Sequence, residues 1–254
     1  MTLAILFACF VWWFSTGAIL WMVSRGSGRG ALLLTAPIAA GAFYALYEFA
    51  YQTGDLAAYG GFCAAIVLWG WFELAFLTGV ITGPNTLPCP LGLKGMRRFL
   101  LAWGTIAHHE LTLLLTAIAL GSMVAGAPEQ TGLWTFLILF FARISAKLNI
   151  YLGVSNLSHE MMPGALAHMK TYFADRRMNW LFPVSITLLT FAIACWIERA
   201  IAVDGSGTGF ILLAALTSLA LVEHWLMVLP VRDSALWSWM TKRDAPGQGA
   251  KPAD

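Results

Sequence analysis

The sequence has little charge and no cysteine pattern. Only 11% of its 254 residues are charged and 59% are hydrophobic, whereas about 25% of the residues in a soluble domain are charged. The four cysteines form no CxxC pair, and three of them lie in apolar segments, so neither a disulfide framework nor a cysteine zinc site is indicated. No basic run is interleaved with aromatic residues, which argues against a nucleic-acid partner. The shortage of charge indicates a membrane protein.

Apolar runs of about 20 residues, the length that spans the hydrocarbon core of a bilayer, are abundant. We therefore predict an all-α, polytopic integral membrane protein whose residues 1–230 form one domain of seven transmembrane helices. The helices are expected at 3–23, 31–51, 56–81, 99–125, 132–152, 180–201 and 209–230. A long connection, 153–179, and a tail, 231–254, lie outside these spans.

Lysine and arginine predict the direction of the helices. Twelve of the 15 basic residues lie in alternate connections, namely 24–30, 82–98, 153–179 and 231–254. Because basic loops remain in the cytoplasm, we expect a periplasmic N-terminus, a cytoplasmic loop at 153–179 and a cytoplasmic C-terminus. That loop contains PGALAHMKTYF, whose apolar residues recur at helical spacing. This pattern is typical either of a short helix lying in the membrane interface or of a connecting helix packed on the bundle.

Ionisable residues interrupt four of the predicted helices at a similar depth. With a rise of about 1.5 Å per residue, they lie roughly 8 to 15 Å below the cytoplasmic boundary. Threonines and a histidine also repeat at helical spacing within 99–125, which predicts a polar stripe on that helix. The candidate site residues are Glu73, His108, His109, Glu110, Arg143, Lys147, Glu223 and His224.

Charged groups inside a membrane need partners, and three roles for these residues are open. The first role is a network of ion pairs and hydrogen bonds that holds the bundle together. The second is a ligand site, and the third is a site of proton transfer or catalysis. In a ligand site, neutral imidazoles would ligate the metal of a chlorin or porphyrin, or a transition metal, with the carboxylates in support. No catalytic motif is found, because His159–Glu160 continues as HEMMP instead of HExxH. We therefore expect that the protein is not an enzyme.

Several segments resemble one known family. They are WGWFELAFLTGVITGPNTLPCP (69–90), HHELTLLL (108–115), TFLILFFARISAKLNIYLGVSNLSHEMMP (135–163), TYFADRRMNWLFPVSI (171–186) and LVEHWLMVLPV (221–231). The chain resembles the photosynthetic complex assembly protein family called PuhE over nearly its whole length. The most specific parts of the resemblance are SAKLN-x-x-LGV-x-N-L and MN-x-LFPVS.

The resemblance implies a multi-pass protein of the bacterial inner, intracytoplasmic photosynthetic membrane that serves assembly of the reaction centre and core antenna. The implied partners are the lipid bilayer and reaction-centre and light-harvesting 1 subunits or other assembly factors. The implied cofactor is a transiently held bacteriochlorophyll or another tetrapyrrole, whose acidic group would pair with Arg143 or Lys147. The alternatives are a membrane-embedded enzyme or transporter acting on a tetrapyrrole or lipid, and an accessory structural subunit of a photosynthetic complex.

Overall fold

The computed structural model describes residues 1–25, 28–156, 163–174, 178–203, 205 and 207–229, and within them it has helices and no β-strand. The helices are α1 (Thr2–Ser24), α2 (Gly28–Ala50), α3 (Asp55–Leu77), α4 (Gly95–Gly104), α5 (Ala107–Met123), α6 (Thr131–Leu152), the 3-10 helix η2 (Gly164–Tyr172), α7 (Leu181–Ala202) and α8 (Thr208–Leu226). The all-α prediction is confirmed for this part of the chain. The predicted tail 231–254, residue 230 of the last predicted span, and His159–Glu160 lie outside the described residues.

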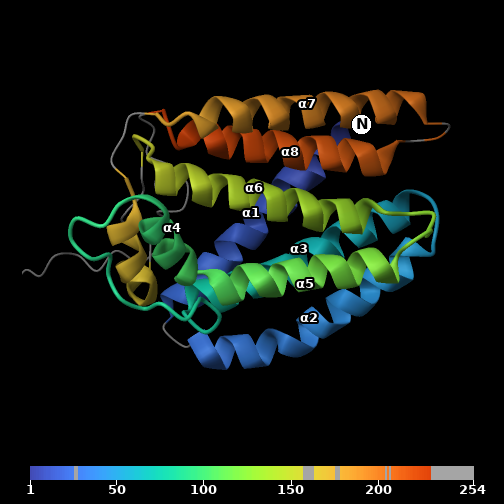
Figure 1. Cartoon of the computed structure of the whole chain (residues 1–254). Coiled ribbons are helices and arrows are strands. Elements are labelled where there is room, and N and C mark those ends of the chain that lie inside the picture. Colours follow the sequence, from blue (N-terminus) through green and yellow to red (C-terminus); the bar gives the residue numbers. More distant parts are fainter. Residues whose placement is uncertain (26–27, 157–162, 175–177, 204, 206, 230–254) are drawn as a thin grey trace, which may run out of the picture.

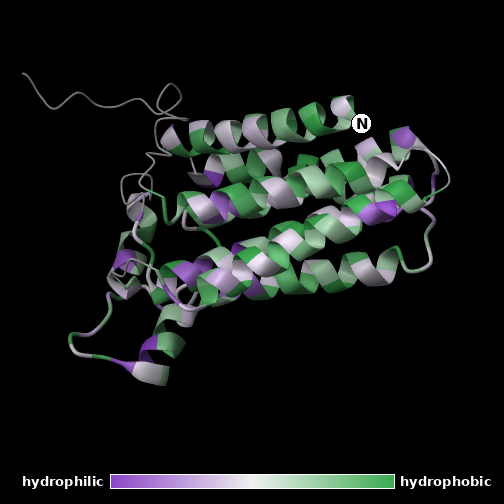
Figure 2. Cartoon of the chain, turned by 90° about the horizontal axis from the view of Figure 1, so that it is seen from above, coloured by the Kyte–Doolittle hydropathy of each residue, from purple (hydrophilic) through white to green (hydrophobic). Residues whose placement is uncertain are grey.

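Six of these helices are long and apolar enough to cross a membrane, and α4 with α5 makes a seventh span if the bent pair counts as one. Hydrophilic residues gather toward the two ends of the bundle, while the long helices are coloured mainly as hydrophobic (Figure 2). The N-terminus lies at the same end as the α2–α3 and α5–α6 connections, and α4 lies at the other end (Figure 1). The side of the membrane that each end faces stays a prediction.

Helix α3 forms the centre of the bundle. It contacts α1, α2, α5, α6 and α8, and 14 of its 23 residues are buried. Small residues allow these close contacts, as in other membrane helix pairs. At Gly61, for example, a Cβ atom would lie only 3.2 Å from the backbone nitrogen of Gly132 on α6. Helices α7 and α8 pack together along one edge, and α2 lies at the opposite edge (Figure 1).

The predicted helix 99–125 is wrong as a single helix. The chain breaks after α4, and α4 and α5 meet at an angle of 69°. The break is stable because the segment 82–85 satisfies the backbone groups that it frees: the His109 amide donates to the Thr82 carbonyl at 2.9 Å, and the Asn85 amide donates to the Gly104 carbonyl at 3.0 Å. The predicted polar stripe is therefore interrupted at the break.

The segment PGALAHMKTYF forms η2, which packs on the bundle. Its Leu166 and Met169 are buried in a cluster with Phe76 at the end of α3. Of the two alternatives for this segment, the structure supports the connecting helix over the helix lying in the interface.

The tight approach at Gly83 gives a test of the broken helix. A Cβ atom at this position would lie 2.6 Å from the Thr105 carbonyl carbon and would overlap the Gly104 carbonyl oxygen. We expect Gly83→Ala to lower the free energy of unfolding by about 1 to 3 kcal/mol, as overpacking does. The measurement is the thermal unfolding midpoint of the detergent-solubilised protein. Gly121→Ala is the matched control, because no atom lies within 4 Å of a Cβ there; equal midpoints for the two variants would contradict the described packing.

Candidate ligand site

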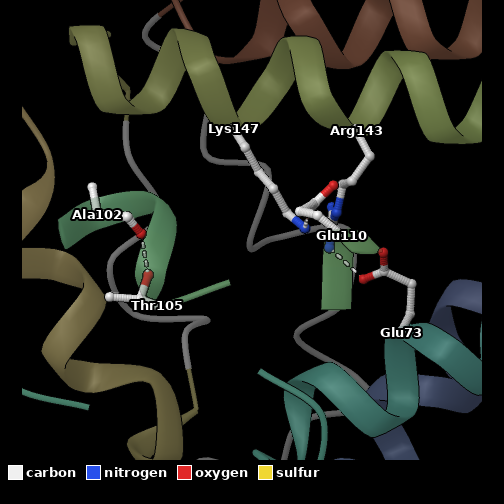
Figure 3. Close-up of polar contacts among 6 residues, drawn as sticks. All are labelled: Glu73, Ala102, Thr105, Glu110, Arg143 and Lys147. Atoms are coloured by element: carbon white, nitrogen blue, oxygen red, sulfur yellow. Dashed lines mark hydrogen bonds and ion pairs between the residues drawn. The ribbon is translucent and has the colours of Figure 1, made fainter. Parts of the chain in front are cut away.

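Two ion pairs join α6 to α3 and α5. Arg143 and Lys147 are one helical turn apart on α6, so they lie on the same face. Arg143 Nη2 is 2.5 Å from Glu73 Oε2 on α3, and Lys147 Nζ is 2.5 Å from Glu110 Oε1 on α5. Both cationic side chains extend from α6 toward the two carboxylates (Figure 3). The structure thus brings four of the predicted site residues together.

The four charges are paired but not fully satisfied. The side chains of Glu73, Glu110 and Lys147 are mostly enclosed, whereas that of Arg143 is 39% exposed. Glu73 Oε1, Glu110 Oε2 and Arg143 Nε have no hydrogen-bond partner. Burying ionised groups costs free energy that pairing offsets only when the remaining polar atoms are satisfied. Pairing therefore offsets only part of the free-energy cost of burying these four charged side chains.

Glu223 adds a third carboxylate to this region from α8. It interacts electrostatically with Arg143 and accepts a hydrogen bond from the Trp12 side chain of α1. Glu223 is otherwise exposed on the surface of the bundle. Arg143 therefore faces carboxylates on both α3 and α8.

The three predicted histidines have three different environments. His108 is exposed on the surface of α5. His109, the next residue, is fully buried, and neither of its ring nitrogens has a hydrogen-bond partner. Its ring lies against Phe76, with 4.6 Å between the ring centroids. His224 is also buried but belongs to a separate polar network.

In that network both nitrogens of His224 are engaged. Nδ1 is 2.8 Å from the Ala220 carbonyl oxygen, and Nε2 is 2.9 Å from Ser145 Oγ. A carbonyl can only accept, so Nδ1 carries the proton. Ser145 Oγ, the partner of Nε2, also donates to Ser185 Oγ on α7 at 2.9 Å. The network therefore ties α6, α7 and α8 together.

Asn179 is a structural residue that the sequence reasoning missed. Its amide donates to the carbonyls of Asn149 and Gly153 at the end of α6, and its side-chain oxygen accepts from the amides of Leu181 and Phe182 at the start of α7. All of its hydrogen-bonding groups are used, so it joins two helix ends. The sequence carries a signal for this role, because Asn179 directly precedes an apolar helix in MN-x-LFPVS, the position of a helix-capping asparagine.

A groove of about 580 Å³ lies beside the ion pairs, and we call it the α4–α6 groove. It is lined by Phe76, Leu77, Phe99, Ala102, Trp103, Thr105, Ile106, Glu110, Leu111, Leu114, Phe140, Arg143, Ile144, Ala146, Lys147, Leu148, Ile150, Tyr151, Pro163, Leu166, Met169, Tyr172 and Phe173. Among the described residues, its charged lining residues are Glu110, Arg143 and Lys147. The lining residues Trp103, Leu111 and Leu114 are exposed, so apolar side chains flank the groove on the surface of the bundle.

The volume and lining of this groove suit a small amphipathic molecule, because ligand sites are typically about 300–1,000 Å³, mainly apolar, with a few polar groups. A bare metal ion is a poorer fit. Among the described residues, no three His, Cys, Asp or Glu side chains come together to hold one. The arrangement can therefore anchor a polar group beside its charged residues and enclose an apolar body along the rest.

The Lys147–Glu110 pair gives a test of the buried charges. Lys147→Met leaves the enclosed Glu110 carboxylate without its cation, and we expect a loss of about 3 to 5 kcal/mol in the free energy of unfolding. The double variant Lys147→Met/Glu110→Gln removes both charges and should recover most of that loss. Thermal unfolding in detergent measures both effects. A double variant as unstable as the single one would show that the pairing is not what matters.

The two buried histidines give a second test. Leu at either position removes the polar nitrogens and replaces the imidazole by an apolar side chain of similar size. His224→Leu removes the contacts of the imidazole with Ser145 Oγ and with the Ala220 carbonyl, so we expect a loss of about 1 to 3 kcal/mol in the free energy of unfolding. His109→Leu removes no hydrogen bond, so we expect an unchanged or higher unfolding midpoint. A marked loss of stability in His109→Leu would mean that its nitrogens have partners.

Comparison with known proteins places the chain in a family. Residues 1–248 match the family described as "Protein of unknown function (DUF3623)". The chain is 48% identical over 239 residues to the "Uncharacterized 30.4 kDa protein in puhA 5'region" of Rhodobacter capsulatus, a match that covers 91% of this chain and 87% of that protein. No solved structure matches the chain. The protein thus belongs to the DUF3623 family.

Proposed function

We propose that this protein is an integral membrane factor for assembly of the bacterial photosynthetic reaction centre and core antenna, and that it handles a bacteriochlorophyll or related tetrapyrrole in the α4–α6 groove. The observation that carries this proposal is an apolar, aromatic groove with exposed apolar residues in its lining and two cations on its wall. The pigment is a cargo here, held and passed on.

The groove offers the two kinds of contact that such a pigment needs. Aromatic residues, including Phe99, Trp103 and Tyr151, provide faces against which a flat conjugated ring can pack. Arg143 and Lys147 provide donors for acidic or carbonyl groups on its periphery, and such charge-assisted hydrogen bonds are strong where water is scarce. Since exposed apolar residues flank the groove, a lipophilic molecule can enter it from the bilayer without passing through water.

A second groove, of about 560 Å³, lies between α1, α7 and α8, and the described residues that line it include no Asp, Glu, Lys or Arg. It offers an apolar molecule a surface, with Ser218 as a polar side chain but no cationic side chain. The α4–α6 groove is therefore the better site for a molecule with both an apolar body and polar groups.

The proposed pigment and the proposed process rest on the name of a relative and on a family resemblance. The relative from Rhodobacter capsulatus is named for its place in the puhA 5' region, and the chain resembles the photosynthetic complex assembly family PuhE. Reaction-centre and light-harvesting 1 subunits are the partners to which a pigment held here would be passed. This role requires a location in the photosynthetic inner membrane. The distribution of basic residues favours a periplasmic N-terminus and a cytoplasmic C-terminus.

A bulky residue in the groove tests the proposal. Ala146 lines the groove on α6, and Ala146→Trp would fill it. We expect wild-type protein, purified in mild detergent from phototrophically grown cells, to carry bacteriochlorophyll absorption, and Ala146→Trp to lose about tenfold in affinity or more. Ala119→Trp is the matched control, because Ala119 is exposed on α5 and does not line the groove.

The readouts are the absorption spectrum per mole of protein and the yield of assembled reaction centre in cells carrying each variant. Loss of both signals in Ala146→Trp, with both retained in Ala119→Trp, would support the proposal. A colourless wild-type protein that co-purifies with reaction-centre or antenna subunits would overturn the pigment role and leave protein assembly alone.

A further inference from the structure

His109 is an unusual buried residue. Its side chain has no exposed surface, and both Nδ1 and Nε2 lack a hydrogen-bond partner. An unsatisfied polar group of this kind costs about 1 to 3 kcal/mol. Its backbone is fully used, since the His109 amide donates to Thr82. The position of the residue is therefore fixed while its imidazole is free to take a further contact.

Phe76 contacts both this imidazole and the α4–α6 groove. It lines the groove and is 6% exposed. Its ring lies against His109 at 4.6 Å, and Lys147 Nζ is 4.6 Å from the centroid of the same ring. Phe76 therefore links the unpartnered imidazole to a charged residue of the groove.

The chemistry of the surroundings limits what His109 can bind. A free metal ion would need several protein ligands, and none of the described groups of His, Cys, Asp or Glu can supply them. One imidazole is sufficient only for a metal that already carries its other ligands. A planar metal macrocycle is such a species, because its ring supplies the equatorial nitrogens and leaves an axial position open.

We propose that His109 is the axial ligand for the metal of a planar macrocycle bound in the α4–α6 groove, and that Phe76 covers this ligand when the groove is empty. The inference rests on the proposed function, since it assigns a residue within the same site. When the ring of Phe76 turns away from His109, the imidazole faces the groove. The macrocycle then takes the place of the phenyl ring, and Lys147 remains beside it.

The other two histidines do not suit this role. His224 has both nitrogens engaged, with Ser145 and Ala220. His108 is exposed, and it does not line the groove. It is nevertheless adjacent in sequence, so His108→Ala is a matched control for His109→Ala.

The experiment uses two probes on the purified full-length protein in nanodiscs: iron protoporphyrin IX and metal-free protoporphyrin IX. The two probes share the same macrocycle, but only the first can take an axial ligand. We expect wild-type protein and His108→Ala to give the absorption spectrum of an imidazole-ligated iron porphyrin. We expect His109→Ala to lose that spectrum and about tenfold in affinity for the iron probe, with its affinity for the metal-free probe unchanged. Added imidazole should restore the spectrum in His109→Gly, which separates loss of the ligand from misfolding.

Phe76→Ala tests the covering role. It should accelerate binding of the iron probe and raise its affinity more than that of the metal-free probe. An imidazole-ligated spectrum that survives in His109→Ala would overturn the inference and leave the proposed function in place. Failure of wild-type protein to bind either porphyrin would overturn both.

Discussion

An ionised side chain inside a membrane is normally paired with an opposite charge, and α6 carries two such side chains one helical turn apart. Arg143 and Lys147 lie on one face of that helix, so the helices that supply Glu73 and Glu110 must turn those carboxylates toward it. This fixes the rotation of α3 and of α5 about their axes. The remaining features of the site follow, because Phe76 lies three residues after Glu73, and His109 directly precedes Glu110.

Because of the break between α4 and α5, these charges line a groove in addition to joining helices. A straight helix through residues 99–125 would have placed α4 in line with α5. Instead, α4 turns away at 69°, and Glu110, Arg143 and Lys147 line the groove beside it. An ion-pair network and a ligand site were separate explanations for these residues at the level of sequence. In the structure the same side chains form the ion pairs and line the groove, and each pair leaves polar atoms without a hydrogen-bond partner.

The positions of the helices were predictable because length and apolar composition alone determine what can span a bilayer. The helix break was not, since the groups that stabilise it, Thr82 and Asn85, lie about 20 residues earlier in the chain. The site was predicted as a set of residues but not as an arrangement, because spacing does not fix helix rotation. His108 and His109 illustrate this: adjacent residues on a helix point about 100° apart, and one is exposed while the other is enclosed.

His109 and His224 differ in their hydrogen bonding: the imidazole of His224 has partners in the fold, whereas that of His109 has none. Both imidazoles are buried on helices of the same bundle. His224 fills its hydrogen-bonding capacity with a backbone carbonyl and a serine, as buried polar groups normally do. His109 fills none of it, although its ring packs as a hydrophobic side chain would. An apolar residue would pack there without the cost of two unsatisfied nitrogens, so packing does not explain the histidine, and this is why the proposed axial ligand is assigned to His109 and not to His224.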